Sequence, residues 1–161
     1  MEIRLATLDD AEAIAAIYNV EVETSTATFD LVPRSIEDQR HWLADRSGAL
    51  SAIVAVEGTA VVGFASLSLY KERAAYRTTV EDSVYVRRDR HGQGVGRALL
   101  TELLDVARAS GFHAVMARIE ATREASIALH RACGFAVVGT EREVGRKFNR
   151  WLDATIMQTL L

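Results

Sequence analysis

Cysteine and proline are scarce in this chain of 161 residues, which has one of each, Cys133 and Pro33. A single cysteine excludes an internal disulfide bond and a metal site built from several cysteines. Long apolar runs are also missing, because no stretch approaches the roughly 18 residues that suggest a membrane-spanning helix. The first residues, MEIRLATLDD, lack the pattern of a secretory signal peptide. We therefore expect a cytoplasmic protein.

Charge of one sign is not in large excess either. The net charge is −3 and the isoelectric point is near 5.8, which argues against a nucleic-acid partner or a membrane-surface partner. His41, His91 and His113 show no metal-binding spacing, so no metal is expected. Apolar residues make up 49% and charged residues 25% of the chain, without repeats or linkers. Residues 1–161 are therefore predicted to form a single globular domain.

The stretch Val80–Leu100 combines three patterns in a row. An alternating apolar run predicts a strand, a basic turn with Gly92, Gly94 and Gly96 follows, and an amphipathic pattern predicts a helix. Such glycines let successive backbone N–H groups point into one hollow, where the helix dipole favours an anion. Basic side chains can add contacts there: Arg90, His91 and Arg97. The spacing excludes a nucleotide-triphosphate loop and disfavours a dinucleotide fold, so a pyrophosphate site of another kind is predicted.

The rest of the chain alternates between helix and strand patterns. Cap-like starts at Thr7-x-x-Asp10 and Ser35-x-x-Asp38 predict two helices separated by a loop over Thr24–Asp30. The predicted strands are Ile3–Leu5, Ser51–Val56, Ala60–Tyr70, Thr78–Val86, His113–Ile119, Phe135–Val138 and Leu152–Leu160, and the later helices are Gly96–Ser110 and Ala125–Cys133. This order predicts an α/β fold of mixed α+β type, with a mixed sheet and helices on both faces.

The glycine loop, R-H-G-Q-G-V-G-R-A-L-L, resembles the acyl-CoA loop of the GCN5-related N-acetyltransferases (the GNAT family). Three further stretches, A-Y-R-T-T-V-E-D-S-V-Y-V, S-I-A-L-H-R-A-C-G-F and R-E-V-G-R-K-F-N-R-W-L-D, resemble phosphinothricin and methionine sulfoximine acetyltransferases. The resemblance implies a mostly antiparallel sheet with a splayed strand that binds acetyl-CoA. It also implies transfer of acetyl to the α-amino group of a small amino acid or analogue, a homodimer, and no metal. Two positions depart from the family: His91 replaces an Arg or Gln, and Arg123 replaces an Asn.

Glu81 is the strongest catalytic candidate. An amine attacks only when it is neutral, so a base must take its proton. A carboxylate in mid-strand among valines can have its pKa raised towards neutrality by burial. The alternative is a surface carboxylate on the outward face of the strand. Asp82 points to the other face, where a structural role is expected.

His130 is the second catalytic candidate, because its ordinary pKa of about 6.5 suits proton transfer near neutrality. It takes the position where many acetyltransferases have a tyrosine, which suggests a role near the CoA sulfur or the incoming amine. The alternative is a packed or exposed helix histidine.

The resemblance also assigns binding residues. Backbone amides of the splayed strand would hold the pantetheine, and backbone amides of the glycine loop would hold the pyrophosphate. The expected cofactor-binding residues are Val84, Tyr85, Val86, His91, Gly92, Gln93, Gly94, Val95, Gly96, Arg97, Arg123 and Ser126. The expected acceptor residues are Phe29, Lys71, Arg73, Tyr76 and Tyr85, since cationic groups suit the oxyanions of such substrates. Arg146, Lys147 and Arg150 either reach the acceptor site or a dimer partner, or form a solvated loop.

Other functions stay open at this point. A protein N-terminus or a polyamine is the alternative acceptor, although Lys71 and Arg73 speak against a polycation. A non-catalytic CoA-binding domain is the alternative outside enzymes, which the presence of both Glu81 and His130 opposes.

Overall fold

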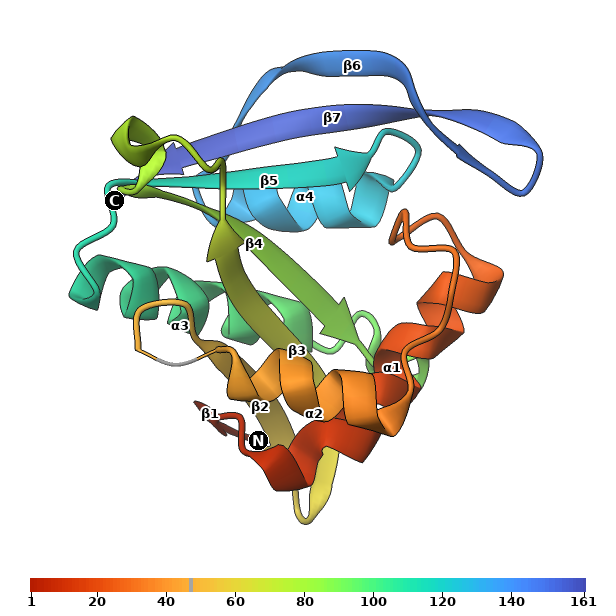
Figure 1. Cartoon of the computed structure of the whole chain (residues 1–161), viewed down its shortest axis with the longest axis vertical. Coiled ribbons are helices and arrows are strands. Elements are labelled where there is room, and N and C mark those ends of the chain that lie inside the picture. The colour runs from red at the N-terminus through yellow and green to blue at the C-terminus, as the bar shows by residue number, and fades with distance from the viewer. Residues whose placement is uncertain (47) are drawn as a thin grey trace.

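The computed structural model describes residues 1–46 and 48–161 (Figure 1). Its strands are β1 (Glu2–Leu5), β2 (Ala52–Glu57), β3 (Ala60–Leu69), β4 (Thr79–Val86), β5 (Ala114–Glu120), β6 (Ala136–Lys147) and β7 (Arg150–Leu160). Its helices are α1 (Ala11–Thr24), α2 (Ile36–Ala44), α3 (Val95–Ala109) and α4 (Glu124–Ala132), with three short 3-10 turns at Leu8–Asp10, Ala74–Tyr76 and Arg88–Arg90. In the described part of the chain, none of the helices has the length and apolar character that crossing a bilayer requires.

The strands form one seven-stranded sheet in the order β1-β2-β3-β4-β5-β7-β6. Every neighbouring pair is antiparallel except β4 and β5, which run parallel. The prediction of a mixed, mostly antiparallel sheet is confirmed.

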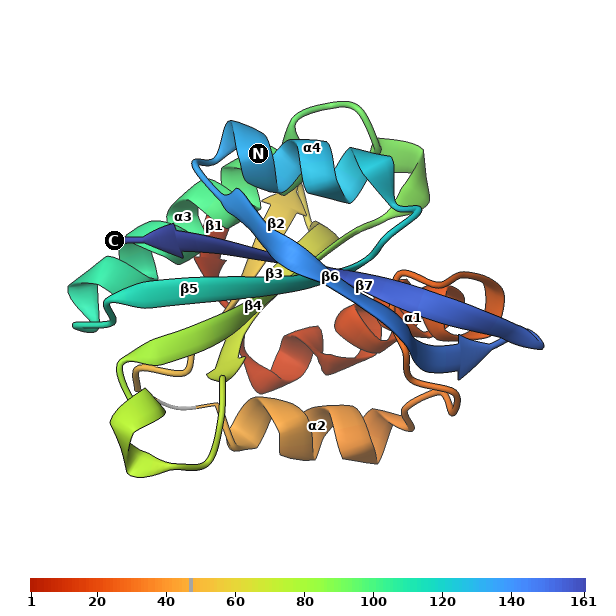
Figure 2. The same ribbon diagram turned by 90° about the horizontal axis from the view of Figure 1, so that it is seen from above.

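Helices cover both faces of the sheet, as the element order predicts (Figure 2). On one face, the apolar stripe of α3, with Leu99 and Leu103 fully buried, packs against the inner side chains of the central strands. On the other face, α1 and α2 pack against β2 and β3 around Ile14 and Phe64. Helix α2 begins where the sequence predicts, because the side chain of its N-cap residue Ser35 accepts a hydrogen bond from the N–H of Asp38.

Strands β4 and β5 pair over three residues only. The register joins Thr79–Glu81 to Ala114–Met116, and both strands then continue without pairing to each other. Figure 1 shows them diverging from this point like the arms of a V. The expected splayed strand is therefore present, and it leaves the β5-facing backbone groups of β4 without a strand partner beyond Glu81.

The C-terminal hairpin is longer than the sequence predicts. Strand β6 runs from Ala136 to Lys147, whereas the prediction stopped at Val138 and placed a connection over Gly145–Arg150. The turn is formed by Phe148 and Asn149, both with positive φ, of 51° and 59°. A two-residue hairpin turn of type I′ needs positive φ at both positions and usually contains glycine. Phe148 gives no such signal, and the surrounding charged run looks like a loop.

Candidate active site

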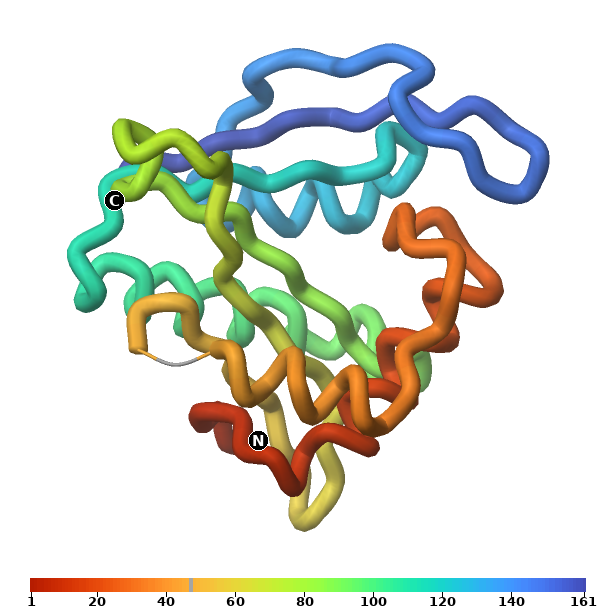
Figure 3. The backbone as a smooth tube through the Cα atoms, viewed as in Figure 1, coloured from red at the N-terminus to blue at the C-terminus, as the bar shows by residue number. Residues whose placement is uncertain are grey.

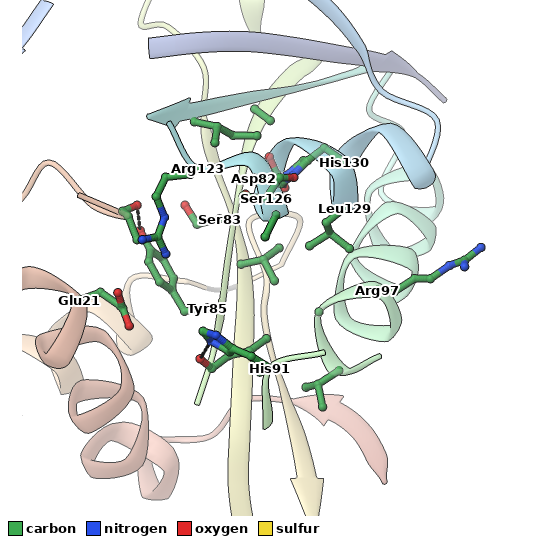
Figure 4. A pocket seen from close by; sticks show the side chains of 18 of the residues that line it. Glu21, Asp82, Ser83, Tyr85, His91, Arg97, Arg123, Ser126, Leu129 and His130 are labelled. Atoms are coloured by element: carbon green, nitrogen blue, oxygen red, sulfur yellow. Dashed lines mark hydrogen bonds and ion pairs between the residues drawn. The ribbon is translucent and has the colours of Figure 1, made fainter. Parts of the chain in front are cut away.

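A cleft of about 460 Å³ opens where β4 and β5 diverge. Its walls come from β4, the loop after β4, the first turn of α3, the end of β5 and the inner side of α4 (Figure 4). Every expected cofactor residue except Gln93 lines it. The amide of Gln93 instead donates to the carbonyl oxygen of Asp89, 3.1 Å away.

The glycine loop has the backbone that its sequence requires. Gly92 and Gly94 have φ of +73° and +84°, a region that side chains other than glycine rarely adopt. Gly94 is also the N-cap of α3, so the free N–H groups of the first helical turn begin there. Gly96 serves packing instead, because a Cβ there would lie 3.2 Å from Leu129 of α4. The loop and the helix start together form an anion site at one end of the cleft.

Two basic side chains of this loop are bound to protein groups. Nε2 of His91 lies 2.9 Å from the carbonyl oxygen of Val86, which ties the loop back to the end of β4. Arg90 forms ion pairs of 2.9 Å with both Glu57 and Asp89. Arg90 is therefore neutralised by two carboxylates, and the expectation that it contacts the anion finds no support.

Asp82 of β4 and His130 of α4 form a buried pair on one side of the cleft. Nε2 of His130 lies 2.8 Å from Oδ2 of Asp82, and its Nδ1 lies 2.7 Å from the carbonyl oxygen of Ser126. Burial alone would lower the pKa of His130, but the hydrogen bond and the charge of Asp82 outweigh burial and raise it. Asp82 is thus more than a packing residue, since it links β4 to α4 through His130.

Glu81 stands at the vertex of the V. It is the last residue of β4 to pair with β5, opposite Met116. Side chains alternate along a strand, so Glu81 shares a face with Ser83 and Tyr85, which line the cleft. Glu81 itself is half-buried and lies just beyond the cleft lining. Burial raises its pKa, and the positive charge of Arg118 offsets part of that effect.

Two of the expected acceptor residues lie close to the cleft. Tyr85 lines it, and its hydroxyl lies 3.4 Å from the carbonyl oxygen of Ala27, another lining residue. Phe29 follows in the same loop, and its ring packs directly against Gly145 of β6. A Cβ atom added at Gly145 would lie only 2.4 Å from this ring. Figure 3 shows the segment after α1 rising towards the β6–β7 hairpin. This loop therefore connects the two halves of the molecule beside the cleft.

The other expected acceptor residues lie elsewhere. Lys71, Arg73 and Tyr76, together with Glu72, line a second hollow on the connection between β3 and β4. The ammonium of Lys71 lies over Tyr76 at 5.1 Å from the ring centroid. The two hollows share no lining residue.

Glu21 was not identified from the sequence as a residue of the cleft, and the role of Lys147 was left open. Glu21 of α1 lines the cleft and forms a 2.8 Å ion pair with Arg88. Lys147 is buried, and its Nζ donates to the carbonyl oxygen of Thr28 at 2.9 Å, so it is not part of a solvated loop. Glu21 looks like any polar helix residue, and only the tertiary fold brings Lys147 to the loop after α1.

The cleft fits an acyl-CoA. Backbone N–H groups at its glycine end suit a pyrophosphate, and the unpaired edge of β4 suits the amide-bearing pantetheine arm. These features together define an acyl-CoA-dependent transferase site.

The chain belongs to the acetyltransferase (GNAT) family, whose domain model matches residues 3–156. It is therefore an N-acetyltransferase that uses acetyl-CoA. It is 41% identical to the L-methionine sulfoximine/L-methionine sulfone acetyltransferase of Pseudomonas aeruginosa, over 97% of this chain and 92% of that protein. It is 40% identical to the phosphinothricin N-acetyltransferase of Alcaligenes faecalis, over 97% and 80%. The crystal structure of a phosphinothricin acetyltransferase from Sinorhizobium meliloti in complex with acetyl-CoA superposes with a TM-score of 0.95, at 37% identity over 99% of this chain and 88% of that one.

Proposed function

We propose that this enzyme acetylates the α-amino group of a small amino acid or analogue of the methionine sulfone, methionine sulfoximine or phosphinothricin type. The observation that carries the proposal is similarity of about 40% identity over nearly the whole chain to enzymes named for these acceptors. The position of Glu81 supports it, because Glu81 is the last residue of β4 to pair with β5 and the cleft-lining residues of β4 follow directly after it.

Glu81 is the proposed general base. Acetyl-CoA, when bound, supplies the acetyl group as a thioester. The acceptor amine is mostly protonated at neutral pH, and Glu81 takes its proton directly or through one water molecule. Burial raises the pKa of Glu81 towards the range where a base acts best near neutrality. Backbone N–H groups of β4 beyond Glu81 are free to stabilise negative charge on the reacting carbonyl oxygen.

The cofactor residues are proposed as the sequence assigned them, except for Arg123, whose side chain is assigned to the acceptor below. The N–H groups of the loop from Gly92 to Gly96 hold the pyrophosphate, and the backbone of Val84 and Val86 holds the pantetheine. His91 supports the loop through Val86. Gln93 is proposed to contribute through its backbone N–H, since its side chain is bound to Asp89.

For the acceptor we propose Phe29 and Tyr85 beside the cleft, and Lys71, Arg73 and Tyr76 at the other end of β4. Along β4, Glu81 lies between Tyr85 and the connection that carries Lys71, Arg73 and Tyr76. The second group would then meet the part of the acceptor that carries the phosphinate or sulfoximine oxygens.

We also propose a homodimer in the cytoplasm. Apolar side chains on the C-terminal hairpin support the dimer, because Val138 is 61% exposed and Trp151 is 60% exposed. A second copy covering this hairpin would remove them from water. Light scattering coupled to size exclusion tests the dimer, and charged substitutions at Val138 and Trp151 should give monomers.

The acceptor is tested by following thiol release from acetyl-CoA. The panel holds methionine sulfone, methionine sulfoximine, phosphinothricin, ordinary amino acids, a polyamine and a peptide with a free N-terminus. The proposal expects the highest kcat/KM among the first three. Preference for the polyamine or peptide, or thiol release with none of the panel, would contradict it.

A further inference from the structure

The acidic side chains that line the cleft all have partners of their own. Glu21 pairs with Arg88 at 2.8 Å, and Asp82 pairs with His130 at 2.8 Å. Glu120 accepts hydrogen bonds from the N–H and the hydroxyl of Thr122, at 2.5 and 2.7 Å. Each of these carboxylates therefore already has a partner, although Oδ1 of Asp82 forms no hydrogen bond within the described part of the chain.

Most of the basic side chains that line the cleft are also accounted for. Arg90 is held by Glu57 and Asp89, and Arg118 forms an ion pair with Glu141. Arg97 belongs to the anion end of the cleft, on the first turn of α3, and its side chain points away from Arg123 (Figure 4). Within residues 1–46 and 48–161, the guanidinium of Arg123 forms neither a hydrogen bond nor an ion pair, although the residue is half-buried and its positive charge helps to lower the pKa of Glu21.

The backbone of Arg123 is fixed. It is the N-cap of α4; its N–H donates to the carbonyl oxygen of Glu120 at 2.9 Å, and its own carbonyl accepts from Ser126 at 3.1 Å. From this point the side chain extends into the cleft, on the side of Glu21, Ser83 and Tyr85 (Figure 4). That side carries the face of β4 to which Glu81 belongs, whereas Asp82 and His130 lie on the other side.

We propose that Arg123 binds the α-carboxylate of the acceptor amino acid, which rests on the function proposed above. A half-buried guanidinium without a partner is costly, and a carboxylate satisfies its planar fork with two parallel hydrogen bonds. The amino and carboxylate groups of an amino acid are attached to the same carbon atom. Anchoring the carboxylate therefore fixes the amine on the side of β4 that carries Glu81.

The test compares methionine sulfone with its α-carboxamide, which keeps the amine and the side chain but lacks the negative charge. In Arg123→Gln, the KM for methionine sulfone should rise about ten- to a hundredfold, the effect of losing a charge-assisted hydrogen bond. The KM for the carboxamide and the KM for acetyl-CoA should change little. Arg123→Lys should recover part of the affinity for methionine sulfone, since it keeps the charge without the fork.

Arg97→Gln is the matched control, because it removes an arginine beside the anion end of the cleft. It should raise the KM for acetyl-CoA and leave the preference for sulfone over carboxamide as in the wild type. If Arg123→Gln raises the KM values for the sulfone and the carboxamide equally, or raises the KM for acetyl-CoA instead, the inference is wrong. If the wild type acetylates neither compound, the proposed function itself is wrong. If the wild type and Arg123→Gln prefer the sulfone over the carboxamide by the same factor, this inference alone is wrong.

Discussion

Both ring nitrogens of His130 face acceptors: Nε2 lies 2.8 Å from Oδ2 of Asp82, and Nδ1 lies 2.7 Å from the carbonyl oxygen of Ser126. Two acceptors call for two N–H donors, so the ring is best described as an imidazolium. An imidazolium has no lone pair with which to take a proton from an amine. This geometry favours a positioning role for His130, joining α4 to β4, and leaves Glu81 as the candidate base.

The pair predicts a pH dependence of stability. The folded pKa of His130 is raised, so its stabilising effect is complete below the unfolded pKa of about 6.5 and is lost as pH rises through the folded value. Chemical denaturation should show wild-type stability falling across this window, and Asp82→Asn should reduce the fall. His130→Ala, which leaves Asp82 buried without a partner, should cost about 3–5 kcal/mol at neutral pH. Equal pH dependence in wild type and Asp82→Asn would contradict the pairing.

The glycine loop is tested by Gly94→Val, with Gly111→Val as its control. Both glycines have φ of +84° and open space around a new Cβ, so both substitutions strain the backbone by similar amounts. Only Gly94 lies at the anion site, where a side chain would obstruct the approach of the pyrophosphate. Acetyl-CoA should raise the melting temperatures of wild type and of Gly111→Val by similar amounts, and that of Gly94→Val by much less. Stabilisation by ATP or NAD without stabilisation by CoA would mean that the loop binds another ligand.

The loop after α1 is tested through the ring of Phe29. A Cβ at Gly145 would lie 2.4 Å from this ring, so Gly145→Ala must displace it. Gly139, on the same strand, has open space and is the control. Gly145→Ala should raise the KM for the acceptor more than the KM for acetyl-CoA, while Gly139→Ala changes neither. If Gly145→Ala leaves the acceptor KM unchanged, Phe29 does not contribute to the acceptor site.

The loop between β3 and β4 is tested by Arg73→Ala. Loss of a charge-assisted hydrogen bond should raise the KM for phosphinothricin about ten- to a hundredfold. The KM for acetyl-CoA should stay near the wild-type value. Arg77→Ala, in the same exposed connection, is the control. An equal effect of Arg73→Ala on both substrates would assign Arg73 to the fold and not to the acceptor.

Much of this architecture is predictable because local patterns decide it. The strand, glycine loop and helix around Gly94 follow from periodicity and backbone freedom, and the structure has them within a residue or two. The C-terminal hairpin was underestimated, because its turn at Phe148 and Asn149 lacks the glycine that usually marks one.

The site was only partly predictable, since its side chains depend on tertiary contacts. No local pattern shows that Asp82 meets His130, that Arg90 is bound by Glu57, or that Lys147 reaches the loop after α1. The separation of Lys71 and Arg73 from the cleft is likewise a property of the fold.

The central claim, that Glu81 is the base, is tested most directly by the pH dependence of kcat/KM for the acceptor in wild type and Glu81→Gln. General-base catalysis is worth about 10²–10⁴-fold in rate, so the kcat/KM of Glu81→Gln should fall by roughly that factor near neutrality. The difference from wild type should shrink as pH rises, because more of the amine is then already neutral. The wild-type rate should rise with pH through the raised pKa of Glu81, and this rise should persist in His130→Ala and disappear in Glu81→Gln. A Glu81→Gln enzyme with near wild-type activity at neutral pH, and with the same rise, would contradict the account.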